Sequence, residues 1–172
     1  MPWIAPQPPV LTDEPTTGAD RPILRALLAY QRRTLLNICA GLTGEQLAER
    51  ALPPSTLSLL GLVRHMAKVE RTWFCERVAG QDLEPMYDAT LGKDADFDDL
   101  DAEQAEADFD RFTAACRAAD DAAADVDLDF ELEDRGDLLS LRFVYLHMLT
   151  EYARHNGHAD LLRERLDGTT GR

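Results

Sequence analysis

Three of the four histidines in this chain, His147, His155 and His158, lie within twelve residues near its C-terminus. Together with Glu151 they are spaced at i+4, i+4 and i+3, so on a helix the four side chains share one face. Neighbours one helical turn apart can both reach a single divalent ion, and imidazole and carboxylate groups are suitable ligands for it. One pair binds metal weakly, so a further ligand must come from elsewhere, and His65 is the remaining histidine.

The spacing alone leaves the identity of the metal-binding pair open. The candidates are His147 with Glu151, Glu151 with His155, and His155 with His158, because His147 and His155 are about 12 Å apart along a helix axis. The alternative is a polar helix face exposed to water. Apolar residues on both sides of the stripe favour a helix that is buried nearly all round, which makes unpaired polar groups there unfavourable.

Long amphipathic helices must position these residues. The apolar periodicity and the cap signals predict four of them, at about 21–40, 58–79, 102–123 and 140–166. Asp20 is the predicted N-cap of the first helix, Ser140 is the predicted N-cap of the last, and Gly168 follows the end of the last. Thr43, with Glu45 and Gln46 behind it, predicts a short helical segment that runs to about residue 50.

The segments between these helices complete the predicted organisation. Residues 1–19 hold five of the nine prolines and are interpreted as an extended arm, followed by a single domain at 20–168. Residues 81–101, with Pro85, Gly92 and several aspartates, predict a long crossover between the second and third helices. Residues 124–139 alternate acidic and apolar side chains, which is compatible with a short strand, but we interpret them as a polar connection. The predicted fold class is all-α, a four-helix bundle.

The composition excludes several classes of partner. With 32 acidic and 18 basic residues the formal net charge is −14, so we expect no nucleic-acid partner and no anionic membrane surface. Apolar runs do not approach the roughly 20 residues of a membrane span, and the N-terminus lacks signal-peptide features. Cys39, Cys75 and Cys116 are widely spaced and odd in number, which predicts buried free thiols and a reducing, cytoplasmic location.

Two stretches of the sequence resemble the DinB-like superfamily. They are SLLGLVRHMAKVERTWF at 58–74 and SLRFVYLHMLTEYARHNGHADLLR at 140–163, and the likeness extends over nearly the whole chain. The chain is most similar to an actinobacterial branch related to mycothiol-dependent maleylpyruvate isomerase and to bacillithiol and mycothiol transferases. The resemblance implies a four-helix metalloprotein that binds a divalent ion through one histidine of the second helix and an i, i+4 pair of the last helix.

Carried onto this sequence, the resemblance implies that His65, Glu151 and His155 are the metal ligands. Glu151 takes a position where histidine is usual, as in the isomerase branch. His158 stands where glutamine is common, so it is interpreted, like His147, as a residue that supports the ligands or contacts substrate. Two nitrogen ligands and one oxygen ligand leave coordination positions open, which is typical of a catalytic site. Zinc is the expected ion, with nickel or iron as alternatives.

The function implied by the resemblance is activation of a low-molecular-weight thiol, of the mycothiol type, for S-transfer or isomerisation of an electrophilic small molecule. A metal-dependent hydrolase is one alternative, with His147 or His158 as general base. A non-catalytic, metal-braced binding or stress-response protein is another. Arginines such as Arg64 and Arg154 are candidates for holding a carboxylated substrate. The family includes monomers and dimers, so a homodimer is an open expectation.

Overall fold

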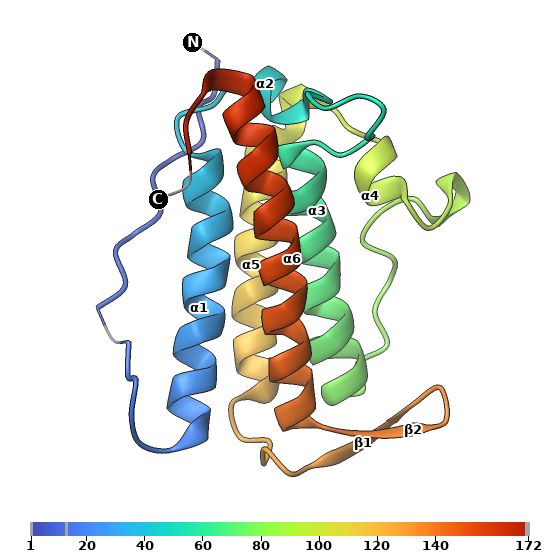
Figure 1. The fold of residues 1–172 in the computed structure, drawn as a ribbon. Coiled ribbons are helices and arrows are strands. Elements are labelled where there is room, and N and C mark those ends of the chain that lie inside the picture. The colour runs from blue at the N-terminus through green and yellow to red at the C-terminus, as the bar shows by residue number, and fades with distance from the viewer. Residues whose placement is uncertain (1, 13, 171–172) are drawn as a thin grey trace.

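Four long helices run side by side in the structure, a computed structural model that describes residues 2–12 and 14–170 (Figure 1). The four are α1 (Asp20–Cys39), α3 (Leu59–Glu70), α5 (Ala105–Ala123) and α6 (Leu141–Asp167). Helix α1 packs mainly on α6, and α3 packs on α5 and α6. The prediction of a mainly helical chain is confirmed. Met1 and Asp13 of the predicted arm, and Gly171 and Arg172 of the tail, lie outside the described residues.

The ends of α6 follow from its sequence. The Ser140 hydroxyl accepts a hydrogen bond from the backbone N–H of Phe143, which satisfies one of the free donors in the first turn. Gly168 ends the helix with φ at 78°, a left-handed conformation that glycine adopts at little cost. Both predicted boundaries are therefore confirmed. The predicted cap of α1 is wrong, because Ala19 is its N-cap and Asp20 lies in its first turn. A negative charge there interacts favourably with the positive end of the helix dipole.

The second predicted helix changes its hydrogen-bonding pattern halfway along. Residues Leu59–Glu70 form α3, and the π-helix η1 (Arg71–Val78) continues it without a break. Ser58 caps the start of α3 by accepting a hydrogen bond from Gly61. A π-helix shifts the faces on which later residues lie, and such segments are frequent at functional sites. Here it carries Trp73 and Cys75 downstream of His65.

The predicted crossover is present and contains short helices. It includes η2 (Ala89–Leu91) and α4 (Ala95–Asp98) and leads into η3 (Ala102–Gln104) before α5. In Figure 1, α4 lies on the outer side of α3, and the two are in contact. The short helix α2 (Gly44–Ala48) begins with the predicted capping box, in which Thr43 and Gln46 exchange hydrogen bonds.

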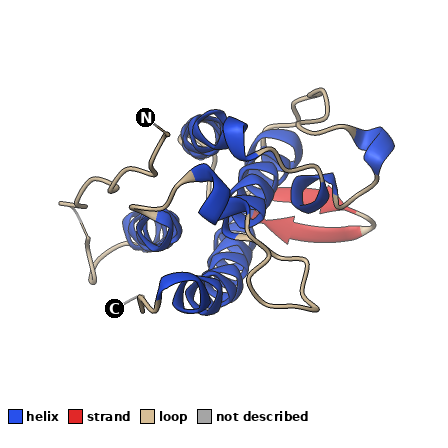
Figure 2. Ribbon diagram, turned by 90° about the horizontal axis from the view of Figure 1, so that it is seen from above, coloured by secondary structure: helices blue, strands red, loops and turns tan. Residues whose placement is uncertain are grey.

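The interpretation of residues 124–139 as a polar connection is wrong for its second half. Strands β1 (Glu131–Asp134) and β2 (Asp137–Ser140) form an antiparallel hairpin, at the end of the long helices opposite to α2 (Figures 1 and 2). Leu132 of β1 is buried, so one of the alternating apolar residues does reach the core. Arg135 and Gly136 form the turn with positive φ values of 55° and 91°.

The N-terminal arm packs on its own chain. Trp3 makes an edge-to-face contact with Phe109 of α5 at a ring-centre distance of 5.0 Å. Ile4 forms an isolated antiparallel bridge with Thr43, and Ala5 is buried. The core beneath is apolar and continuous, and it includes Phe109 and Phe112 of α5. Within the described residues, the helices lack the length and apolar character that crossing a membrane requires.

Candidate metal centre

Helices α3 and α6 bring together His65, Glu151 and His155, the three residues that the resemblance implies as ligands. One donor atom from each lies within 4.8 Å of the other two. The rings of His65 and His155 are 4.8 Å apart and inclined at 62°, while Nε2 of His155 lies 3.4 Å from Oε2 of Glu151. All three side chains are partly buried, so a small molecule can still approach them.

These distances suit a zinc-sized ion. Two donors bound tetrahedrally to zinc at about 2.0–2.1 Å are separated by about 3.3 Å, close to the distance between Glu151 and His155. The three donors lie within 4.8 Å of one another, so the set must contract by up to about 1.5 Å to reach this separation throughout. Nδ1 of His155 is buried without a hydrogen-bond partner among the described residues. A buried nitrogen without a partner indicates that this ring has a bonding partner that the protein chain does not supply.

The environment keeps His155 neutral. Burial lowers its pKa, the neighbouring His65 and His158 lower it further, and the carboxylate of Glu151 opposes them, with a net value of about 4. Neutral imidazole is the form that binds metal, because protonation removes the lone pair. His155 is therefore ready to act as a ligand at neutral pH.

His65 has a partner that the sequence did not identify. Its Nδ1 lies 2.7 Å from Oδ2 of Asp96, a carboxylate on α4 that is only 1% exposed. The other oxygen of Asp96 accepts a hydrogen bond from Lys68 at 3.0 Å. Burial would raise the pKa of Asp96, but the hydrogen bonds from His65 and Lys68 outweigh it and leave that pKa below its usual value. The sequence alone does not distinguish Asp96 from the other aspartates of the crossover.

His147 lies next to the three donors but outside the group. Its Nε2 is 3.7 Å from Oε1 of Glu151, the carboxylate oxygen that does not face His155. Its ring packs 4.3 Å from Trp73 of the π-helix and 6.0 Å from Phe143. The supporting or substrate-contacting role of His147 stays a prediction. Phe143 lies one turn before His147 on the same helix, as helical spacing predicts, whereas the contact with Trp73 joins two helices and has no signal in the spacing along either one.

His158 lies on the other side of His155, with a ring-centre distance of 5.6 Å. Its Nδ1 is buried and has no hydrogen-bond partner among the described residues. It is not part of the group of three donors. The expectation that His158 supports the ligands or contacts substrate stays a prediction.

The cysteines and the two arginines named in the sequence analysis lie outside the group of three donors. Burial raises the pKa of the Cys39 thiol to about 12 and raises that of Cys75, so neither is a ready nucleophile. Arg64 is not available to a substrate, because it is buried against Asp108 of α5. Asp108 is itself buried, whereas Glu106, Asp110 and Asp121 of the same helix are exposed. Arg154 is exposed on α6.

Comparison with known proteins identifies the family of the chain. Residues 23–168, well over half of the chain, match a family model described as mycothiol-S-transferase. A search of curated proteins and a search of solved structures each found no match. The matched family lies within the DinB-like superfamily, as the resemblance of the two motifs predicts. The chain therefore belongs to the mycothiol-S-transferase family.

Proposed function

We propose that this protein joins a low-molecular-weight thiol, of the mycothiol type, through its sulfur to an electrophilic small molecule. We also propose that His65, Glu151 and His155 hold a divalent ion, with zinc as the best fit. The observation that carries the proposal is the convergence of these three donors from two helices, within 4.8 Å, in a chain of the mycothiol-S-transferase family.

The three donors would provide a site at which a divalent ion activates a thiol. When bound, a divalent ion lowers the pKa of a thiol, so that the reactive thiolate is present near neutral pH. The sulfur then forms a bond to the electrophilic carbon, the leaving group departs with its electron pair, and the thiol proton is released to solvent. Three protein ligands leave room for substrate.

The surrounding side chains shape this site. Phe97 stacks on one face of His65 at 4.8 Å and limits the access of water there. His147 and His158 flank the donors on either side, and we assign them to substrate contact. We also propose that the four long helices form the four-helix bundle of the DinB-like superfamily, with the crossover between α3 and α5.

The direct test measures thiol transfer. The purified chain, loaded with zinc, is mixed with mycothiol and 1-chloro-2,4-dinitrobenzene, and formation of the thioether is followed by absorbance and mass spectrometry. We expect turnover that requires mycothiol, stops with a chelator and returns with zinc. Cys75→Ser should keep most of the activity, because that thiol is buried, and Glu151→Gln should lose it.

Two results would overturn the proposal. Equal consumption of the electrophile with and without thiol would point to hydrolysis, in which water replaces the thiol. Full activity of the His65→Ala and His155→Ala variants would show that the transfer does not use the proposed ion. A panel of alkyl and aryl halides and epoxides protects the test against a single poor substrate.

A further inference from the structure

The crossover places one buried carboxylate against the proposed metal site. Asp96 lies in α4, 31 residues beyond His65, and accepts a hydrogen bond at 2.7 Å from Nδ1 of that histidine. It is nearly inaccessible to solvent, and its second oxygen is held by Lys68. Since both oxygens have a partner, the carboxylate cannot turn without breaking one of them.

This contact decides which nitrogen of His65 can bind metal. A carboxylate accepts hydrogen bonds but does not donate them, so Nδ1 of His65 must carry the proton and the lone pair is left on Nε2. Phe97, the next residue after Asp96, stacks on the ring with an interplanar angle of 28°. Asp96 and Phe97 together fix the tautomer and the plane of the imidazole.

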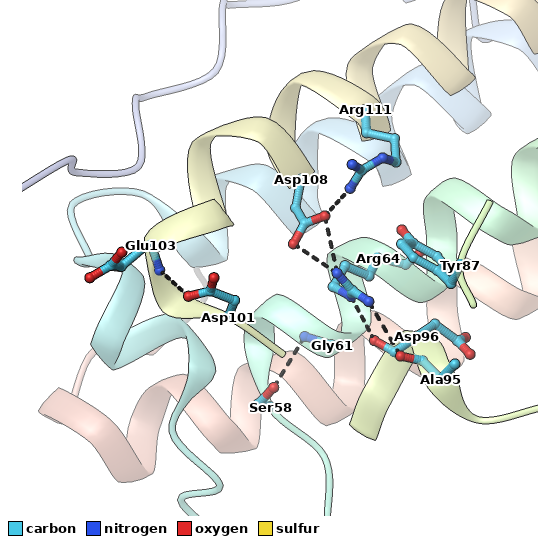
Figure 3. Close-up of polar contacts among 10 residues, drawn as sticks. All are labelled: Ser58, Gly61, Arg64, Tyr87, Ala95, Asp96, Asp101, Glu103, Asp108 and Arg111. Atoms are coloured by element: carbon cyan, nitrogen blue, oxygen red, sulfur yellow. Dashed lines mark hydrogen bonds and ion pairs between the residues drawn. The ribbon is translucent and has the colours of Figure 1, made fainter. Parts of the chain in front are cut away.

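The position of α4 depends on contacts elsewhere in α3 and α5. Arg64 donates to the backbone carbonyls of Asp96 at 3.0 Å and Ala95 at 3.3 Å, while its Nη1 pairs with Asp108 at 3.2 Å (Figure 3). Tyr87 covers the guanidinium from the other side and donates to the Arg64 carbonyl. A buried arginine thus holds the segment that carries Asp96.

Gly61 allows α4 to come this close. A Cβ atom at this position would lie 3.1 Å from the ring of Phe97 and 3.2 Å from Oγ of Ser58, so one of these neighbours would have to shift by a few tenths of an ångström. The absence of a side chain one turn before His65 therefore leaves the space that Phe97 occupies. The sequence provides the glycine, the arginine and the aspartate that this arrangement requires.

We propose that Asp96 is a positioning residue of the metal site, which aims Nε2 of His65 at Glu151 and His155 and couples metal binding to the docking of α4. The proposal rests on the proposed function in that it takes His65 to be a ligand. By reciprocity, a bound ion stabilises the docked crossover as much as the docked crossover strengthens metal binding. The crossover is then part of the site rather than a connection.

The test compares zinc affinity in three matched variants, by competition with a fluorescent chelator. Asp96→Asn removes the charge beside His65, Lys68→Met removes the second partner of Asp96, and Asp98→Asn removes an equal charge from the exposed side of the same helix. We expect Asp96→Asn to weaken zinc binding about 10- to 100-fold, as loss of an outer partner of a ligand typically does. Lys68→Met frees the second oxygen of Asp96 and should weaken zinc binding less than Asp96→Asn does, whereas the control Asp98→Asn should stay within about 3-fold of wild type.

Two further readouts separate positioning from general stability. In the zinc-free protein, ¹⁵N NMR should show His65 protonated at Nδ1, and Asp96→Asn should give a mixture of tautomers. Hydrogen exchange in Ala95–Asp98 should slow when zinc is added to wild type and should change less in Asp96→Asn. Neither effect is expected from a mutation that only loosens the fold.

The outcomes distinguish this inference from the proposed function. Equal zinc affinity of wild type and Asp96→Asn would overturn the inference while leaving the metal site in place. An equal loss in Asp98→Asn would also overturn it, because that variant leaves the contact between Asp96 and His65 intact. If wild type bound no divalent ion, the proposed function would fail, and the tautomer of His65 would still show whether Asp96 controls that ring.

Discussion

His147 and Glu151 face each other one turn apart on α6, with Nε2 of the histidine 3.7 Å from Oε1 of the carboxylate. The other oxygen of Glu151 lies 3.4 Å from Nε2 of His155. The carboxylate can therefore meet an ion on the side of His155 while its second oxygen faces His147. Because the two oxygens of Glu151 face different histidines, we expect substitution of His147 and substitution of His155 to affect metal binding differently.

The first prediction concerns the ligand set. We expect His65→Ala, His155→Ala and Glu151→Gln each to lower zinc affinity by more than the roughly 10- to 100-fold that loss of an outer partner costs. His147→Ala should keep stoichiometric zinc with at most about a 10-fold loss of affinity. Metal content by mass spectrometry and chelator competition measure both, and circular dichroism checks that each variant stays helical. If His147→Ala emptied the site and Glu151→Gln did not, the assignment of Glu151 and His155 as the ligand pair of α6 would be wrong.

The histidine cluster was predictable because helical periodicity is a local property. Ser140 and Gly168 mark the ends of α6, and the register between them places Glu151 and His155 on one face. Asp96 was not predictable in this way. It lies in a four-residue helix within an acidic crossover, and its approach to His65 depends on Gly61 and on the distant pair of Arg64 with Asp108.

The hairpin and the π-helix show two other limits. The alternation in Glu131–Asp134 is the pattern of a strand, but its turn uses Arg135-Gly136 with positive φ at both positions. Such turns favour asparagine, aspartate or glycine, so an arginine at the first position conceals the signal. The π-helix Arg71–Val78 has no comparable local signature, since its residues also suit an ordinary α-helix.

The second prediction concerns a buried charge between the helices. Glu70 is fully buried and accepts two hydrogen bonds from Arg32 and one from the hydroxyl of Tyr152, each at 2.7 Å. Breaking a buried pair by removing one partner leaves the other charge inside the protein, and the loss is about 3–5 kcal/mol. Arg32 keeps its pair with Asp120 at 2.8 Å in Glu70→Gln, so we expect that variant at the lower end of this range, about 3 kcal/mol, and Tyr152→Phe to cost about 1.5–3 kcal/mol.

Urea unfolding followed by circular dichroism measures these changes. The pair of Arg50 with Asp98 is exposed and supplies the control, because such surface pairs contribute less than about 1 kcal/mol. The double variant Arg32→Met with Glu70→Leu should be more stable than either single variant, since no charge is left unpaired in the core. A Glu70→Gln variant within about 1 kcal/mol of wild type would contradict the importance of this pair.

The third prediction contrasts two helical glycines. Gly157 lies inside α6, and an added Cβ would meet no heavy atom within 4 Å. Gly157→Ala should therefore raise the free energy of unfolding by about 0.5–1 kcal/mol, because glycine loses more backbone entropy in a helix than alanine does. At Gly44, the first residue of α2, a Cβ would overlap the backbone carbonyl of Ala102.

Gly44→Ala should instead lower the free energy of unfolding by about 1–3 kcal/mol, because α2 or η3 must move to relieve the overlap. Thermal and urea unfolding of the two variants, side by side with wild type, provide the measurement. Stabilisation by both substitutions would mean that α2 and η3 lie far enough apart to accommodate a methyl group at residue 44.

The last prediction concerns stability at alkaline pH. Cys39 is fully buried, and burial raises the pKa of its thiol to about 12, against a weaker opposing effect of Arg163. In the unfolded chain the thiol loses its proton near pH 8.5, whereas in the folded chain it keeps it. Between these values the unfolded state binds fewer protons, so the free energy of unfolding falls as pH rises, by about 1.4 kcal/mol per pH unit.

Below pH 8.5 the contribution is fully present, and it is lost progressively toward pH 12. Urea unfolding between pH 7.5 and about 10.5 should show a shallower decline for Cys39→Ala than for wild type. Leu35→Ala is the matched control, because it removes a buried side chain of the same helix that does not titrate. That variant should be less stable at every pH and keep the wild-type slope. Equal slopes for wild type and Cys39→Ala would show that the folded thiol titrates near its ordinary pKa and is reachable by solvent.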